Sequence, residues 1–139
     1  MAQTVADVMT GNPTTVDAGA PVLEAARIMR SLDVGSVIVV DSGGVVGIVT
    51  DRDLVIRALA EERDPSRTAV GEICSRDLTA LGPDATVEEA VRLMRERGVR
   101  RLPVVEAGRA VGIVTVGDLA VERNRDSALG EASAGPANQ

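Results

Sequence analysis

The 139-residue sequence contains no histidine and no aromatic residue, and all fifteen of its basic residues are arginines. Without histidine, the chain lacks the usual general base near neutral pH and the commonest transition-metal ligand, which excludes Ser-His-Asp and Cys-His catalytic systems. Without lysine, it can neither form a Schiff base nor complete a P-loop. The missing residue types therefore exclude these catalytic systems, and we expect no metal site.

Cysteine is also nearly absent, and so are long apolar runs. The single cysteine, Cys74, can form neither an intramolecular disulfide nor a thiolate zinc site, so we interpret it as a small buried apolar residue. The longest apolar run, 37–40, is far shorter than a membrane span, and the first residues lack a signal-peptide pattern. We expect a soluble cytoplasmic protein.

The charge balance limits the choice of partner. A formal net charge of −6 and an isoelectric point near 4.7 disfavour nonspecific binding to nucleic acid. The missing aromatic residues also remove the platforms on which unpaired bases stack. At 45% hydrophobic residues, almost all of them aliphatic, the chain can still form a sizeable core.

The chain is an internal duplication. Shifted by 65 positions, residues 5–54 align without a gap with residues 70–119, and 20 of these 50 pairs are identical. We divide the chain into four parts on this basis. They are repeat 1 (5–61), a linker (62–69), repeat 2 (70–122) and a tail (123–139). The tail consists mainly of small and polar residues, and we expect it to be disordered.

A helix is predicted near the start of each repeat, because apolar residues recur at the spacing of one helix face. The stripe is Val22, Ala25, Ala26, Met29 and Leu32 in repeat 1, and Val87, Ala90, Val91 and Met94 in repeat 2. Pro21 occupies the expected first helical position of one helix, and Thr86 with Glu89 forms a capping box at the other.

Two strands follow each of these helices. In repeat 1 the β-branched runs 36–41 and 45–49 flank Ser42-Gly43-Gly44, which predicts a hairpin. Repeat 2 has the corresponding runs 101–106 and 110–114. With an extended piece at the start and a closing helix after Thr50 or Thr115, each repeat has the order strand, helix, strand, strand, helix.

This order predicts an α+β fold. A unit of about fifty residues is marginal alone, so the two copies should pack sheet against sheet as a pseudo-twofold module. Such a module has two clefts, each lined by the end of a strand and the start of the next helix.

A recurring motif marks both closing helices. In 50–53 and 115–118, a strand delivers Thr to a helix start, with Asp three residues later. The helix N-terminus favours an anion such as phosphate, and the Asp carboxylate can accept hydrogen bonds from a ribose diol. The same pattern is also a capping box that needs no ligand, and the two interpretations are compatible.

The stretch 94–105, together with 111–115 and Asp118-Leu119, resembles the cystathionine β-synthase (CBS) domain. Both repeats match, so the chain resembles a stand-alone CBS-domain pair over residues 5–121. The resemblance implies a regulatory module that is not itself an enzyme and needs no cofactor. It also implies that the module binds AMP, ADP, ATP or S-adenosylmethionine in its clefts and commonly dimerises. It also implies that ligand occupancy is signalled to a partner protein, which the sequence does not identify.

Ligand-binding positions follow from this resemblance. They are Thr14, Thr15, Val16, Ile48, Thr50, Arg52 and Asp53 in repeat 1, and Thr79, Ala80, Leu81, Arg100, Arg101, Ile113, Thr115 and Asp118 in repeat 2. Asp53 and Asp118 match the aspartate that binds the ribose in the family. Thr50 and Thr115 match the threonine that contacts the phosphate or the ribose. The aliphatic members, Val16, Ile48, Leu81 and Ile113, would sandwich the adenine, although ordinary core packing is the alternative for them.

Arginine is concentrated in repeat 2. Five of the fifteen arginines lie between positions 92 and 101, and Arg100 and Arg101 occupy positions where the family presents basic residues to phosphates. A solvated edge balanced by glutamates is the alternative interpretation. Because guanidinium groups suit phosphate oxygens, we favour AMP, ADP or ATP over S-adenosylmethionine.

Two further interpretations remain open. The chain can instead be a structural or interaction homodimer with empty clefts. An enzyme that uses its carboxylates is the third alternative, but the sequence offers these groups no base partner or metal cluster.

Overall fold

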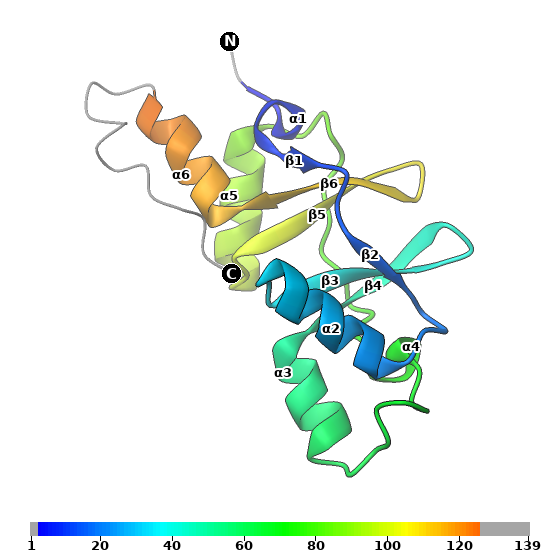
Figure 1. Ribbon diagram of the computed structural model, residues 1–139. Coiled ribbons are helices and arrows are strands. Elements are labelled where there is room, and N and C mark those ends of the chain that lie inside the picture. The colour runs from blue at the N-terminus through cyan, green and yellow to red at the C-terminus, as the bar shows by residue number, and fades with distance from the viewer. Residues whose placement is uncertain (1–2, 126–139) are drawn as a thin grey trace. The chain divides into compact units, whose positions relative to one another are not determined.

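The computed structural model describes residues 3–125, which divide into two compact units (Figure 1). Unit 1 contains the described residues 3–13 and 79–125, and unit 2 contains residues 14–78. Each unit has one three-stranded sheet together with helices, so the predicted α+β class is confirmed.

Unit 2 has the predicted order of elements. They are β2 (Thr15–Asp17), α2 (Val22–Leu32), β3 (Ser36–Asp41), β4 (Gly44–Thr50), α3 (Asp51–Asp53), the π-helix η1 (Leu54–Leu59) and α4 (Val70–Ile73). In its sheet, β3 lies between β2, to which it is parallel, and β4, to which it is antiparallel.

Unit 1 repeats this plan with one difference. Its elements are α1 (Val5–Val8), β1 (Thr10–Gly11), α5 (Val87–Arg97), β5 (Arg101–Glu106), β6 (Arg109–Thr115) and α6 (Val116–Arg125). The expected first strand, 79–81, forms only one parallel bridge, between Leu81 and Val104, and β1 supplies the third strand by pairing with β6. Of the predicted tail, residues 123–125 belong to α6, and 126–139 lie outside the described residues.

The two hairpins form as the sequence predicts. Ser42 and Gly43 have φ values of 53° and 83°, and Ala107 and Gly108 have 52° and 80°. Two central residues with positive φ match the twist of the flanking strands, which explains why glycine stands at the second position of each turn.

The first long helix of each repeat buries most of its predicted stripe. Val22, Ala25 and Met29 are buried in unit 2, and Val87, Ala90 and Met94 are buried in unit 1. Two expectations for α2 are wrong. Pro21 is the N-cap rather than the first helical residue, and Leu32 is 50% exposed because it lies in the last turn, beyond the core.

The predicted capping box at α5 is confirmed. The Glu89 amide donates to Thr86 Oγ1 at 3.1 Å, and the Thr86 amide donates to Glu89 Oε1 at 3.2 Å. One amide of the first turn and the amide that precedes the helix are therefore both satisfied, which fixes where α5 begins.

Each compact unit combines the first residues of one repeat with the body of the other. The amide of Val5 donates to the Ala85 carbonyl oxygen at 2.7 Å in unit 1. At the equivalent positions of the duplication, the amide of Val70 donates to the Ala20 carbonyl oxygen at 2.8 Å in unit 2. The duplication therefore extends to individual hydrogen bonds. The repeats are the units of duplication, whereas the compact units are the units of packing.

Two glycines let the first residues of each repeat, which we call its leading segment, lie close against a sheet edge. Ser75 exchanges two backbone hydrogen bonds with Ile48 on β4, as β1 pairs with β6 at Thr10 and Ile113. A Cβ at Gly47 would collide with the Ser75 carbonyl oxygen, and one at Gly112 with the Met9 side chain and the Thr10 carbonyl oxygen. A side chain at either position would push the leading segment away from the sheet.

Each unit has its own aliphatic core, to which the leading segment contributes. Val70, Ile73 and Cys74 are buried in the core of unit 2, and Val5 is buried in the core of unit 1. The expectation for Cys74 is confirmed, since it is a free, buried thiol. Within residues 3–125, no helix is long and apolar enough to cross a membrane.

Candidate functional site

The Thr and Asp residues of the recurring motif cap the helices that close the two sheets. In unit 2 the Thr50 amide donates to Asp53 Oδ2 at 2.9 Å, and the Asp53 amide donates to Thr50 Oγ1 at 3.1 Å. Thr115 and Asp118 make the same two bonds in unit 1, at 2.9 and 3.1 Å. The capping interpretation is therefore confirmed, and a ligand role for these four residues has to be compatible with it.

The caps leave part of each carboxylate available. Because the backbone hydrogen bond uses Oδ2, Oδ1 of Asp53 and of Asp118 is left outside the cap bond as an acceptor. Both aspartates are half-buried. The amides at the helix start of unit 2 are already paired, since Asp51 donates to the Gly35 carbonyl oxygen at 2.9 Å and Arg52 donates to Asp51 Oδ1 at 2.8 Å. The carboxylate oxygen outside the cap is therefore the group that can accept a hydrogen bond from a hydroxyl donor such as a ribose diol.

The two carboxylates differ in one neighbour. In unit 2, Arg57 Nε lies 3.7 Å from Asp53 Oδ1, and its guanidinium also donates to the carbonyl oxygens of Ile73 and Cys74 at 3.3 and 3.4 Å. The equivalent of Arg57 in the other repeat is Glu122, which carries the opposite charge. Sequence analysis missed Arg57, although its spacing from Asp53 on a helix, one turn further along, was a signal for this ion pair.

The other predicted residues of unit 2 lie on its strands and helix start. Val16 is 2% exposed and belongs to the core, which favours the packing interpretation for this side chain. Ile48 is half-buried on β4, Arg52 is exposed on α3, and Thr14 and Thr15 are exposed at the start of β2. The structure therefore leaves the Thr14, Thr15 and Arg52 side chains open to solvent.

In unit 1, the structure brings Arg101 to the helix start. Arg101 on β5 pairs in register with Thr115 on β6, directly before α6 and Asp118. The Val116 amide also donates to the Arg100 carbonyl oxygen at 2.9 Å. A positive charge thus stands beside the Thr115 and Asp118 pair, as a phosphate group would require.

Unit 2 has a different residue at the position of Arg101. There Ser36 pairs in register with Thr50, and its buried Oγ atom has no hydrogen-bond partner among the described residues. A buried hydroxyl without a partner is uncommon and marks a position where a ligand or water can bind. The alignment of Ser36 with Arg101 in the duplication was the sequence signal for it.

The remaining residues of unit 1 line the same sheet. The Leu81 amide donates to the Pro103 carbonyl oxygen at 3.1 Å, and the Val105 amide donates to the Leu81 carbonyl oxygen at 2.8 Å. Thr79, Ala80, Leu81 and Ile113 are each half-buried. The structure therefore holds the 79–81 segment extended beside β5, although it is too short to be a regular strand.

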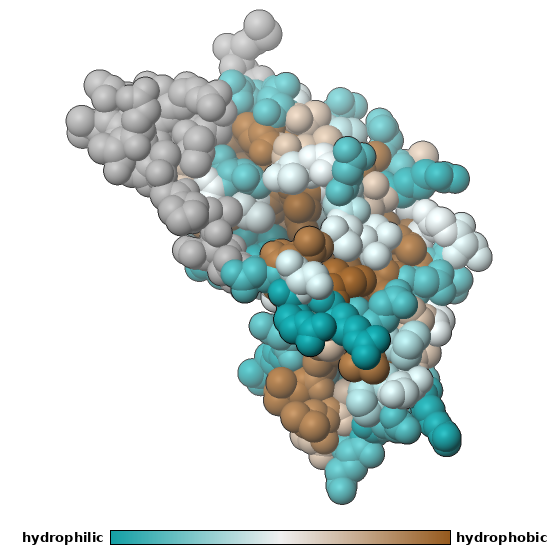
Figure 2. Space-filling view, in the orientation of Figure 1, coloured by the Kyte–Doolittle hydropathy of each residue, from teal (hydrophilic) through white to brown (hydrophobic). Residues whose placement is uncertain are grey.

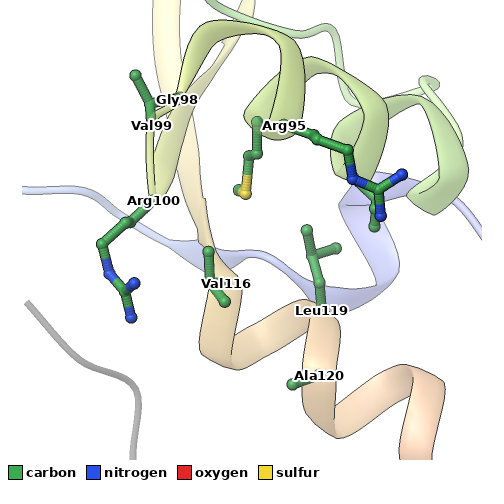
Figure 3. Close-up of a pocket in the computed structure, with 9 residues that line it drawn as sticks. Arg95, Gly98, Val99, Arg100, Val116, Leu119 and Ala120 are labelled. Atoms are coloured by element: carbon green, nitrogen blue, oxygen red, sulfur yellow. The ribbon is translucent and has the colours of Figure 1, made fainter.

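A groove of about 380 Å³ lies in unit 1 between α5, the turn that follows it and the first turns of α6 (Figure 3). We call this cavity the groove. Its lining residues are Val91, Met94, Arg95, Gly98, Val99, Arg100, Val116, Leu119 and Ala120. In Figure 3 the Arg95 and Arg100 side chains lie at opposite ends of the groove, with Val116 and Leu119 between them. Arg100 is thus placed in the groove, whereas Thr115 and Asp118 do not line it.

Residues 3–125 contain no group of three His, Cys, Asp or Glu side chains that could hold a metal ion.

Comparison with known proteins identifies relatives of the whole described chain. A family model described as the CBS domain matches residues 5–59 and again residues 70–124. The CBS domain-containing protein YhcV of Bacillus subtilis is 39% identical over 128 residues, which cover 92% of this chain and 91% of that protein.

Two solved structures have the same fold. The crystal structure of Hypoxic Response Protein I with two coordinated zinc ions has a TM-score of 0.79 and 34% identity, and the match covers 86% of this chain and 98% of that one. The CBS domain pair of protein MJ0100, solved in complex with 5′-methylthioadenosine and S-adenosyl-L-methionine, has a TM-score of 0.78 and 27% identity. That match covers 91% of this chain and all of the other.

Proposed function

Because the chain belongs to the CBS domain family and contains two CBS domains, we propose that it is a sensor of adenosine-containing ligands. CBS pairs are regulatory ligand-binding modules rather than typical enzymes. In our proposal, the chain binds the ligand at its two capped helix starts and signals occupancy to a partner protein.

One observation carries this proposal: the motif of Thr and Asp at a helix start occurs in both units with the same geometry. Each Asp caps its helix with Oδ2 and keeps Oδ1 as an acceptor for a ribose hydroxyl. The helix start and the neighbouring Thr hydroxyl favour a phosphate. The adenosyl ligands of the MJ0100 pair, a protein of the same family and fold, support this ligand class.

Among adenosine-containing ligands, we favour AMP, ADP or ATP. Arg101 stands beside Thr115 in unit 1, and Arg52 is exposed on α3 in unit 2. Guanidinium groups bind phosphate oxygens in a bidentate manner, whereas the sulfonium of S-adenosylmethionine is itself positive. In our proposal each helix start has its own ligand site, formed by the predicted residues of that unit without the core residue Val16, and Ser36 is added to the site of unit 2.

Calorimetric unfolding of the full chain tests this function, since the absence of Trp and Tyr rules out intrinsic fluorescence. Scans with AMP, ADP, ATP and S-adenosylmethionine are compared with scans of the free protein. Ligand at about 100 times its dissociation constant should add about 2.7 kcal/mol to the free energy of unfolding. Asp53→Asn and Asp118→Asn should abolish this gain at the respective site while an amide oxygen preserves the cap.

The matched control is Glu89→Gln, which changes a capping box of the same kind at the start of α5. It should leave ligand stabilisation unchanged. If no ligand raises the unfolding temperature of protein free of bound nucleotide, the sensor proposal fails. The second candidate function, a structural or interaction homodimer with empty clefts, is then better supported. Exposed apolar residues such as Leu59 favour this candidate.

A further inference from the structure

The guanidinium group of Arg57 lies between two sets of acceptors in unit 2. On one side, its Nε atom is 3.7 Å from Asp53 Oδ1. On the other side, its Nη1 atom donates to the carbonyl oxygens of Ile73 and Cys74 at 3.3 and 3.4 Å. Hydrogen bonds that involve a charged group are usually about 2.7–2.9 Å long, so all three contacts are long. The guanidinium is therefore shared between the two sets, and a shift toward either set would shorten the contacts on that side.

The helix that carries Arg57 offers few other acceptors. Exposed side chains on both sides of it along η1 are apolar; they are Val55, Ile56 and Leu59. Figure 2 shows hydrophobic colour over the helical segment that continues from α3 in Figure 1. Glu61 follows four residues later, but no ion pair joins it to Arg57 among residues 3–125. The guanidinium is thus placed between one carboxylate and two carbonyl oxygens.

The two sets of acceptors belong to parts of the chain with different roles. Asp53 is the residue that we propose binds a ribose, whereas the two carbonyl oxygens end α4 in the leading segment of repeat 2. The residue that follows, Ser75, accepts a backbone hydrogen bond from Ile48 on β4 at 3.0 Å and donates one back at 2.9 Å. All of these residues lie in unit 2. Arg57 therefore stands between the candidate ligand site and the point where the leading segment is held to the sheet.

A ribose bound at Asp53 would approach the same oxygen as Arg57. The Thr50 amide donates to Oδ2, so Oδ1 is the acceptor outside the cap. The Asp53 side chain is 13% exposed, which leaves little room for two partners at this oxygen. A hydroxyl donor has to come within about 2.5–3.0 Å of its acceptor, closer than Arg57 now stands. The ribose would therefore displace the guanidinium, for which the carbonyl oxygens at the end of α4 remain as acceptors.

The other repeat has a different residue in place of this arginine. In the alignment of the two repeats, Glu122 corresponds to Arg57, and an ionised glutamate has no hydrogen-bond donor. The caps of the two helix starts are otherwise the same. Two similar candidate sites thus differ in their connection to the rest of their unit, and the site of unit 2 is the one joined through an arginine to a leading segment.

We propose that Arg57 is a switch that reports occupancy of the Asp53 site to the leading segment of repeat 2. In the empty site the guanidinium is shared between both sets of acceptors. In the occupied site it moves to the carbonyl oxygens of Ile73 and Cys74 and holds the leading segment more firmly against β4. By linkage, a firmly held leading segment also favours the ligand. The ligand half of the switch rests on the proposed function, whereas the link from Asp53 through Arg57 to α4 is a property of the free protein.

Amide hydrogen exchange of the full chain without ligand tests the link itself. Asp53→Asn keeps an acceptor for the cap but removes the charge that attracts Arg57, so it imitates the occupied site. The Ser75 amide, which donates to Ile48, should then exchange at least about twofold more slowly. Rates are taken relative to the amides of α2 in the same unit, which report the stability of the unit as a whole. With Arg57→Met in addition, Asp53→Asn should no longer change this relative rate.

The same measurement with AMP tests the ligand half. Asp118→Asn in all variants confines AMP to the site of unit 2. AMP should slow exchange of the Ser75 amide, relative to α2, at least about twofold. Arg57→Met should still be stabilised by AMP in calorimetric unfolding, but its relative rate at Ser75 should not change. Arg67→Met is the matched control, because this arginine is 88% exposed, and it should respond to AMP as the unaltered arginine does.

The single thiol of the chain gives an independent readout. Cys74 is 6% exposed and lies at the end of α4, where its carbonyl oxygen accepts from Arg57. A leading segment that is held more firmly opens less often, so AMP and Asp53→Asn should each slow the reaction of this thiol with an alkylating reagent. Arg57→Met should remove both effects. A faster reaction in the presence of AMP would contradict the direction of the switch.

The outcomes separate the switch from the sensor function. If no ligand raises the unfolding temperature, the sensor proposal and the ligand half of the switch both fail, and Asp53→Asn with and without Arg57→Met still decides the link. If AMP binds but the relative rate at Ser75 stays the same, the sensor function is retained and the switch is overturned. A change at Ser75 that persists in Arg57→Met would also overturn the switch, because the effect would not pass through Arg57.

Discussion

The Nε atom of Arg57 lies 3.7 Å from Oδ1 of Asp53. This ion pair joins α3, the helix that directly follows β4, to an arginine one helical turn later in η1. The same guanidinium donates to the carbonyl oxygens of Ile73 and Cys74, which end α4. Arg57 therefore connects Asp53, the residue proposed to bind a ribose in unit 2, with the leading segment of repeat 2.

Arg57→Met should lower the free energy of unfolding by about 0.5–1.5 kcal/mol, the usual contribution of hydrogen bonds at a half-exposed site. The long Met side chain keeps the packing of the stem but loses the donors. Denaturant unfolding followed by far-ultraviolet circular dichroism measures the change. The control is Arg109→Met, because Arg109 is an exposed arginine at the start of β6, and it should change stability by less. Equal effects of the two substitutions would contradict the stabilising role assigned to Arg57.

Gly47→Ala should destabilise the protein by about 1–3 kcal/mol, because the new methyl group meets the Ser75 carbonyl oxygen and backbone has to move. Gly82→Ala is the control, since a Cβ at Gly82 has no neighbour within 4 Å. Urea unfolding of both variants gives the comparison. Equal stability of the two variants would show that the leading segment at Ser75 is not held against β4 as the structure places it.

The stability contributed by Glu72 should depend on pH. The Ala69 amide donates to Glu72 Oε2 at 2.9 Å, and Arg63 lies 2.7 Å from Oε1, so both hold the pKa of the Glu72 carboxyl below its ordinary value of 4.5, the amide having the larger effect. Because the pKa of Glu72 is lower in the folded protein than in the unfolded chain, its stabilising effect is fully present above the ordinary pKa. The effect is lost as the pH falls through the lowered pKa of the folded protein.

Unfolding temperatures of the unaltered chain and of Glu72→Gln should therefore differ at neutral pH and converge on acidification. The glutamine still accepts the Ala69 hydrogen bond, so the difference measures the charge. Glu88→Gln, on the exposed side of α5, should show little pH-dependent difference. A gap for Glu72→Gln that stays constant well below the ordinary pKa of the carboxyl would contradict the assignment.

The role proposed for Arg101 predicts a difference between nucleotides and nucleosides. Arg101→Gln should weaken AMP binding by about tenfold or more, since a charged hydrogen bond contributes about 1.5–3 kcal/mol. It should leave adenosine binding nearly unchanged, because adenosine has no phosphate. Titration calorimetry with both ligands measures this.

Asp118→Asn provides the contrast in the same experiment. AMP and adenosine share the ribose that Asp118 is proposed to bind, so this substitution should weaken the binding of both compounds to a similar extent. If Arg101→Gln weakens adenosine as strongly as AMP, the charge does not act on the phosphate, and the assignment of Arg101 is wrong.

Local features were predictable because the chemistry that determines them is close in sequence. The strands 36–41 and 101–106 have the bounds that the sequence predicts, and the capping box of Thr86 and Glu89 forms as expected. Turn glycines and β-branched runs act over a few residues, so a single repeat contains the information. The sequence could not decide whether Val16 would contact an adenine or pack in the core, because an aliphatic side chain suits both. The structure places it in the core.

Features that depend on distant segments were not predictable in this way. The expected strand at 79–81 forms only one bridge to β5, and β1 from the other repeat pairs with β6 at the opposite edge of the sheet. The requirement for glycine at Gly47 and Gly112 also depends on a distant segment, because the backbone that lies against each glycine comes from the other repeat. No local pattern encodes which edge a distant segment will pair with.

The sequence by itself determined the duplication, the order of elements, the hairpins and the Thr and Asp motif, because periodicity and turn chemistry are local properties. Only the tertiary structure decided that each unit combines the start of one repeat with the body of the other, and that the Arg57 guanidinium donates to the carbonyl oxygens of Ile73 and Cys74. The physical reason is that an unpaired sheet edge and a guanidinium group can pair with any suitable partner, and folding in three dimensions selects one that is far away in the chain.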